Sequence, residues 1–223
     1  MLQRAVIYDG ATQRQLGPGD TTFGGELINS SITTVGAATI SAAVLISGII
    51  NRTGPTAGYT DTTDSAQNII SNLLASQFVG TGALAGVGIL SGLTFRVSYI
   101  NTVAFAMTLA AGAGVTLGAN TGVSASSVKD YLVTITNGTP TQVYAVTQTN
   151  ASAVITGLTQ LQTQALSVGQ LVTGTNIPAN TTIISIQPGV GVTLSAAATA
   201  TLSLNAITFS PTVRVDSLGQ KLL

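Results

Sequence analysis

The chain has no histidine and no cysteine among its 223 residues, and only 6% of them are charged, against about a quarter in an ordinary soluble domain. Catalysis and metal binding near neutral pH draw mainly on His, Cys and carboxylates, and here seven acidic residues balance seven basic ones. Nearly all zinc sites, thiol nucleophiles and catalytic triads are thereby excluded. We expect no enzyme activity, no catalytic residue, no metal site and no cofactor.

A formal net charge of zero also argues against nucleic acid as a partner. Neutralising phosphates requires clustered Lys and Arg, and the sequence has neither a basic patch nor an aromatic stacking platform. Aromatic residues make up 4% of the chain, and tryptophan is absent. We expect no nucleic-acid binding.

A mean hydropathy of +0.50 raises the question of a membrane segment. Residues 32–50 are uncharged and long enough to span about 30 Å as a helix, and residues 79–95 are a weaker candidate. Thr, Ser and Gly dilute the first stretch, and no Trp/Tyr belt or Lys/Arg bias flanks it. We expect no membrane association, and a small membrane protein remains the least favoured alternative.

What the sequence does contain is a long uncharged stretch between Asp130 and Arg214, filled mostly by Thr, Ser, Ala, Val, Ile, Asn and Gly. This composition predicts uncharged β-structure built for contact. The lack of cysteine agrees with synthesis in a reducing cytoplasm, and residues 1–10 lack the basic and apolar pattern of a secretory signal.

We expect a mainly β fold in four segments. Residues 1–27 form an N-terminal docking arm, and residues 28–149 form a jelly-roll-like β-sandwich with one packed helix. Residues 150–210 form a small second β domain, with the boundary near Asn150, and residues 211–223 form a C-terminal tail. Arg214, Asp216 and Lys221 then belong to a solvated tail.

The arm holds several of the few charges, and residues 5–8 are apolar enough to add a strand to the edge of a neighbouring sheet. A frayed terminus is the alternative. The candidate docking residues are Arg4, Val6, Tyr8, Arg14 and Asp20.

Two local patterns are clear within the sandwich. Asp64 is placed to cap a helix, with Gln67 in the capping-box position. Apolar residues follow at helical spacing, namely Ala66, Ile69, Ile70, Leu73, Leu74 and Phe78. Residues 131–136 and 142–147 read as strands, and the turn residues Asn137 to Pro140 between them predict a β-hairpin.

A short motif occurs twice, as Gly-Ala-Gly-Val-Thr-Leu at residues 112–117 and Gly-Val-Gly-Val-Thr-Leu at residues 189–194. Neither copy has the third glycine or the following helix of a dinucleotide site. Both copies are expected to start a strand after a tight turn.

The remaining charges allow few chemical roles. Lys129 and Asp130 are neighbours on a predicted strand and should point to opposite faces, which argues against a catalytic pair. Asp61 and Asp64 could ligate calcium, but helix capping by Asp64 is favoured because calcium needs several convergent oxygens.

Arg52 and Arg96 have uncharged sequence surroundings. Each could pair with a carboxylate within the subunit or across an interface, and the sequence does not choose between them.

Several runs resemble virion structural proteins of tailed bacteriophages. They are Val-Gly-Ala-Ala-Thr-Ile at 35–40, Arg-Thr-Gly-Pro at 52–55, Tyr-Thr-Asp-Thr-Thr-Asp-Ser-Ala at 59–66, Asn-Thr at 101–102, and residues 109–117 and 127–137. Residues 166–174, 177–178 and 192–195 are similar to small β-modules that recur in phage structural proteins.

The resemblance implies a capsid decoration (cement) protein or a fibre. We expect a cement protein on the capsid surface that binds the major capsid protein as a homotrimer and stabilises the head. A tail-fibre or adhesin component in host attachment is the alternative.

Overall fold

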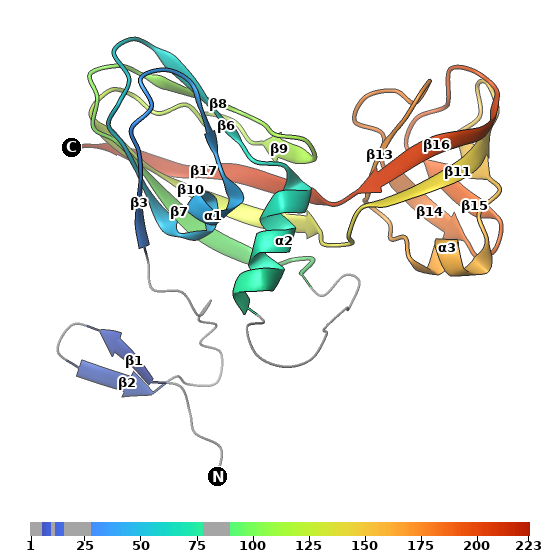
Figure 1. Ribbon diagram of the computed structural model, residues 1–223, viewed down its shortest axis with the longest axis horizontal. Coiled ribbons are helices and arrows are strands. Elements are labelled where there is room, and N and C mark those ends of the chain that lie inside the picture. The colour runs from blue at the N-terminus through green and yellow to red at the C-terminus, as the bar shows by residue number, and fades with distance from the viewer. Residues whose placement is uncertain (1–5, 10–11, 16–27, 78–89) are drawn as a thin grey trace.

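The computed structural model describes residues 6–9, 12–15, 28–77 and 90–223 (Figure 1). Two lobes, each with its own hydrophobic core, are built mainly of strands. The mainly β fold predicted from the sequence is confirmed.

The first lobe winds between two sheets. Its first six strands are β3 (Ile28–Ile32), β4 (Ala38–Ile40), β5 (Gly48–Arg52), β6 (Tyr59–Thr63), β7 (Thr94–Asn101) and β8 (Met107–Ala110). Strands β3, β5 and β7 pair in parallel in one sheet, and β4, β6 and β8 pair in parallel in the other. This alternation is the winding of a three-turn β-solenoid, in which each turn contacts its neighbours. A jelly roll is antiparallel, so these parallel pairs set the lobe apart from one.

Two helices lie between strands of the winding. Helix α1 (Ala42–Ile46) joins β4 to β5, and α2 (Ala66–Gln77) follows β6. The predicted helix is confirmed as α2, and its residues Ala66, Ile69, Ile70 and Leu73 are buried in the first core. Leu74 packs against that core, and Phe78 lies outside the described residues.

The predicted cap of this helix is wrong. Ser65, not Asp64, holds the capping position, because its Oγ accepts from the Asn68 amide at 3.2 Å. Asp64 lies one residue earlier, where its Oδ1 accepts from the Ser65 amide at 2.8 Å and from the Asn68 side chain at 2.7 Å. Its Oδ2 accepts from the Ala42 amide at the start of α1, at 3.0 Å. Gln67 turns towards the segment that connects the two lobes, where its Oε1 accepts from the Thr141 amide at 2.8 Å.

The first sheet continues with β10 (Ser127–Asn137), β17 (Thr212–Leu222) and β9 (Val115–Leu117), in the order β3-β5-β7-β10-β17-β9. The tail expected at residues 211–223 is therefore wrong. Strand β17 lies inside the sheet, with Val213 and Val215 in the core. Val213 and Val215 alternate with polar residues, which is the pattern of a half-buried strand. The position of this pattern near the chain end led to the prediction of a tail.

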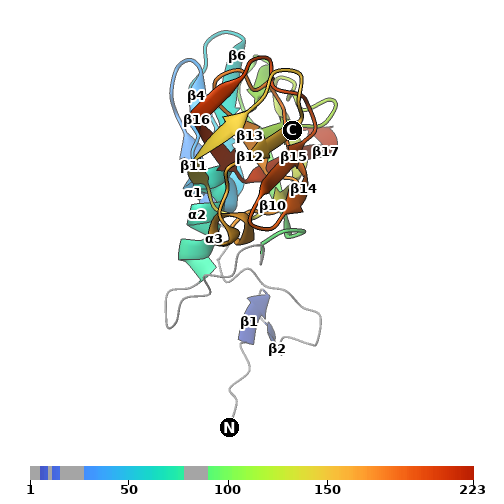
Figure 2. The same ribbon diagram turned by 90° about the vertical axis from the view of Figure 1, so that its right-hand side faces the viewer.

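The second lobe is a small barrel, viewed from its outer end in Figure 2. Its elements are β11 (Gln142–Gln148), β12 (Val154–Thr156), α3 (Gln160–Gln164), β13 (Leu171–Thr173), β14 (Ile183–Gln187), β15 (Gly191–Leu194) and β16 (Leu202–Ser210). The antiparallel order β13-β16-β11-β12-β15-β14 is closed by a bridge between Leu171 and Thr182. Hydrogen bonds join Gly169 N to Ile183 O at 2.8 Å and Ile183 N to Gln170 O at 3.0 Å. Closure leaves few open sheet edges in this lobe.

The barrel is inserted between β10 and β17, which are neighbouring strands of the first sheet (Figure 1). The predicted hairpin is therefore wrong, because β10 and β11 lie in different sheets. The side-chain amide of Asn137 donates to Ser167 Oγ and to Val168 O, both at 2.8 Å. Through these bonds the predicted turn at Asn137 contacts the barrel. The pairing of the strands places the boundary between the lobes between Asn137 and Gln142, not near Asn150 as predicted.

Both copies of the repeated motif begin strands, β9 and β15, as predicted. Gly114 and Gly189 have positive φ angles of 74° and 70° in the preceding turns. At Gly191 the constraint is space, because an added Cβ would lie 1.8 Å from the carbonyl oxygen of Ile155.

We predict that Gly191→Ala lowers the free energy of unfolding by about 2 kcal/mol or more, because β15 and β12 must separate to admit the methyl group. Gly58→Ala is the matched control, since its Cβ would meet only the Ala106 oxygen at 4.0 Å. Chemical denaturation of both variants checks this, and equal stabilities would contradict the packing described for Gly191.

Candidate functional site

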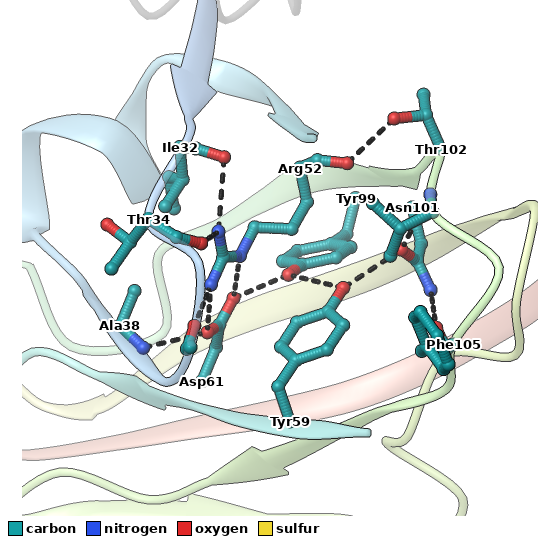
Figure 3. Close-up of polar contacts among 12 residues, drawn as sticks. Ile32, Thr34, Ala38, Arg52, Tyr59, Asp61, Tyr99, Asn101, Thr102 and Phe105 are labelled. Atoms are coloured by element: carbon teal, nitrogen blue, oxygen red, sulfur yellow. Dashed lines mark hydrogen bonds and ion pairs between the residues drawn. The ribbon is translucent and has the colours of Figure 1, made fainter. Parts of the chain in front are cut away.

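A buried ion pair lies between the two sheets of the first lobe (Figure 3). Arg52 on β5 and Asp61 on β6 each have 0% of their surface exposed. The guanidinium contacts the carboxylate through two nitrogens, Nε to Oδ2 at 2.9 Å and Nη2 to Oδ1 at 3.2 Å. This bidentate geometry provides the close pairing that a buried charge pair needs to offset desolvation.

The other donors of Arg52 hold the segment between β3 and β4. Nη1 donates to Ile32 O at 3.2 Å and to Thr34 O at 2.5 Å, and Nη2 donates to Gly36 O. All five guanidinium N–H groups therefore have acceptors. The first two turns of the solenoid are tied together by one side chain.

Asp61 extends the network to the third turn. Its Oδ2 accepts from the Tyr99 hydroxyl of β7 at 2.5 Å, and its Oδ1 accepts from the Ala38 amide at 3.0 Å. The carboxylate thus has four hydrogen-bond donors, two of them from Arg52. The hydrogen-bonding capacity of the Asp61 carboxylate is therefore used by contacts within the lobe.

Tyr59 and Asn101 carry the network towards the loops. The Arg52 Cζ atom lies 4.9 Å from the centre of the Tyr59 ring, a cation–π contact. The Tyr59 hydroxyl donates to Asn101 Oδ1 at 2.9 Å, and Asn101 Nδ2 donates to Phe105 O at 2.8 Å and Ser124 O at 2.9 Å. We call these five side chains, Arg52, Tyr59, Asp61, Tyr99 and Asn101, the core network.

Burial raises the pKa of both network tyrosines above the usual range, and hydrogen bonding to Asp61 adds to the rise for Tyr99. Burial likewise raises the pKa of Tyr131. The hydroxyls stay protonated at neutral pH and act as donors. The arrangement is suited to holding three turns in register.

The alternatives left open for the charged residues are now resolved. Arg52 pairs within the subunit, and so does Arg96, whose Nη2 lies 2.5 Å from Asp130 Oδ2. Hydrogen bonding from Ser98 and the charge of Arg96 lower the pKa of Asp130. Asp61 pairs with Arg52 while Asp64 binds backbone amides, and the described residues hold no cluster of three or more potential metal ligands of the His, Cys, Asp or Glu type.

Lys129 and Asp130 point to opposite faces of β10, as predicted. Lys129 is buried, and its ammonium donates to the carbonyls of Asn120 and Gly122. Burial lowers the pKa of Lys129. The two side chains therefore have separate partners.

The candidate docking residues are only partly described. Val6 and Tyr8 lie in β1 (Val6–Asp9), and Arg14 lies in β2 (Thr12–Gln15). In this hairpin Val6 is opposite Gln15 and Tyr8 is opposite Gln13. In the part of the arm that the structure describes, neither strand pairs with a lobe. Arg4 and Asp20 lie outside the described residues, so docking by the arm stays a prediction.

The outside of the barrel presents a second candidate site, which the sequence indicated only as an uncharged region. We call the outward side of β11 and β16 the barrel face, and its exposed apolar residues are Val143, Ala145, Leu204 and Ala206. No residue between Asp130 and Arg214 is charged, so the whole barrel surface is free of ionisable acids and bases of the Asp, Glu, Lys and Arg types. This surface can be buried against a partner without stranding a charge.

The stretch considered as a membrane span is not one helix in the fold. Residues 32–50, the candidate span, are divided among short strands and a five-residue helix. Among the described residues, no helix combines the length and the apolar character needed to cross a bilayer.

No protein-family model, curated protein or solved structure matches this chain.

We predict that Arg52→Ala lowers the free energy of unfolding by about 3–5 kcal/mol, because Asp61 is left buried without its counter-charge. Arg214→Ala is the control, since Arg214 pairs with Asp216 in an exposed contact and its loss should leave stability nearly unchanged. Equal effects of the two substitutions in denaturant titrations would show that the core network does not stabilise the lobe.

We also predict a loss of stability above pH of about 10, where tyrosines of the unfolded chain ionise. Tyr59, Tyr99 and Tyr131 have raised pKa values in the folded protein. Their contribution is complete below the unfolded pKa, and it is lost as the pH rises towards the folded pKa. Tyr99→Phe should reduce the loss by up to about 1.4 kcal/mol per pH unit.

Tyrosinate absorbance and denaturant titrations in the alkaline range measure this effect. The same protein in concentrated urea is the control, because its tyrosines should ionise near their usual pKa of about 10. An unchanged slope in Tyr99→Phe would contradict the pKa shift assigned to Tyr99.

Proposed function

We propose that the chain is a virion structural protein, a cement or decoration protein that binds the major capsid protein as a homotrimer and stabilises a phage head. The observation that carries the proposal is the barrel, a whole lobe without a charged residue and with apolar side chains on its outer surface. The resemblance of residues 35–66 and 101–137 to phage virion proteins supports the same assignment.

The distribution of charge suits a protein that works by contact. Arg52 and Asp61 pair with each other inside the first lobe, Lys129 donates to carbonyl groups, and Arg96 pairs with Asp130. The barrel is left as an uncharged surface. Interfaces exclude charge from their centres, because a desolvated charge without a partner is costly.

The connection between the lobes suits a load-bearing role. Two neighbouring strands of one sheet, β10 and β17, lead into the barrel and out of it (Figure 1). Gln67 of α2 binds the connecting residue Thr141, whose backbone amide and hydroxyl donate to Gln67 Oε1 at 2.8 and 2.6 Å. Asn137 at the end of β10 also donates to Ser167 Oγ and to Val168 O of the barrel, both at 2.8 Å. The barrel is thereby held on the solenoid lobe by more than a linker.

In this proposal the arm attaches the protein to the coat and the barrel contacts a neighbouring molecule. The hairpin β1–β2 fits the first role because a two-stranded hairpin is only marginally stable alone. Pairing with an edge of a coat-protein sheet would complete it.

The test uses purified heads that lack the protein, mixed with the full chain or with a chain that starts at residue 28. We expect the full chain to bind and to raise the temperature at which heads break open, and the shortened chain to fail to bind while keeping its oligomeric mass. Equal binding of both chains would contradict docking by the arm. Failure of the full chain to bind heads, together with loss of host attachment by particles that lack it, would replace the proposal by a fibre role.

A further inference from the structure

The barrel face has apolar side chains at its centre and no charge around it. Ala145 of β11 lies opposite Ala206 of β16, and Val143 lies opposite Thr208. Ala145 and Ala206 are exposed, and Val143 is 59% exposed. The two strands run side by side along the barrel (Figure 1), so the alanine pair forms a low, flat area.

Leu204 stands beside this flat area in an unfavourable backbone conformation. The pairing of β11 with β16 shifts between Val146 and Gln148, so that Ser203 and Leu204 together stand opposite Thr147. Leu204 takes a positive φ of 54° and is 81% exposed. The left-handed region is unfavourable for a non-glycine residue, and glycine is usual at such a bulge.

A bulky apolar side chain that is both strained and exposed gains nothing from the fold of its own chain. Such outliers persist where a functional contact uses them. Leu204 is a projecting apolar residue next to a flat alanine pair, so the barrel face presents a knob and a shallow seat on the same surface. A surface with both parts is complementary to itself.

We propose that the barrel faces of the copies in the homotrimer meet, with Leu204 of each copy seated over Ala145 and Ala206 of the next. This inference rests on the proposed function in one respect, because it takes the molecule next to the barrel to be another copy in the homotrimer. The absence of charge supports a second copy as the partner, because the barrel of another copy has no charged side chain to place opposite the alanine pair. The outer face of the first lobe is different, since Arg96, Asp130 and Arg214 lie on it.

The neighbouring side chains provide the rest of such a contact. A specific interface buries about 800 Å² on each partner, which is more than four apolar residues supply. Threonines on the same side of the sheet, at 147, 156 and 208, surround them and can donate and accept hydrogen bonds. Such a border of hydroxyls around an apolar centre is the usual anatomy of an interface.

Sedimentation equilibrium of the full chain over a range of concentrations tests the inference. We expect the unmodified protein to form a species of about three times 22.3 kDa. Ala206→Asp, which places a charge at the centre of the contact, should weaken association by at least about tenfold. Ser185→Asp, at an exposed position of β14 across the closed barrel, is the matched control and should associate as the unmodified chain does.

Leu204→Gly separates loss of the contact from loss of the fold. Glycine accepts the positive φ, so this variant should melt at the same or a higher temperature when dilute and still associate more weakly. An unmodified chain that stays at 22.3 kDa, or an Ala206→Asp variant that associates normally, overturns the inference. A monomer that binds heads would overturn this inference and the homotrimer of the proposed function, and would leave only capsid binding standing. Self-association through the barrel face without head binding would overturn capsid binding and leave this inference standing.

Discussion

The first lobe depends on the contact between Arg52 and Asp61. A parallel winding brings strands together that are far apart in sequence, and its short strands offer few backbone bonds each. The guanidinium binds the carbonyls of Ile32, Thr34 and Gly36, and the carboxylate binds Tyr99, so a single ion pair contacts all three turns. The register of the winding is set by this ion pair. Every buried donor of the pair needs an acceptor, and only one arrangement of the three turns provides them all.

The second lobe obeys a different constraint. Its ten-residue core is apolar and its barrel is closed, so it needs no charge for folding. With charge absent from its exterior as well, solubility and specificity depend on hydroxyl groups and on shape. Placing this barrel between β10 and β17 ties it to the six-stranded sheet of the first lobe. A contact made by the barrel is thereby transmitted to the lobe that the core network stabilises.

Local patterns were readable from the sequence where local physics decides the structure. The spacing of Ile69, Ile70 and Leu73 predicted α2, and the patterns at residues 131–136 and 142–147 predicted the strands β10 and β11. Pairing was not readable. Asn137 and Gly138 have the chemistry of a hairpin turn, but Asn137 binds Ser167, thirty positions further along. Arg52 and Asp61 were each conspicuous in the sequence, but their pairing could not be predicted because the turns of the winding differ in length. The positive φ of Leu204 could not be predicted either, because the composition of the chain does not indicate it.

Hydroxyl-radical footprinting of the protein, first dilute and then bound to heads, measures the central claim that the uncharged barrel is a contact surface. The account predicts that oxidation of Leu204 and Val143 falls on assembly, while exposed Leu218 of β17 stays reactive. Undiminished oxidation of Leu204 and Val143 in the bound protein would contradict it.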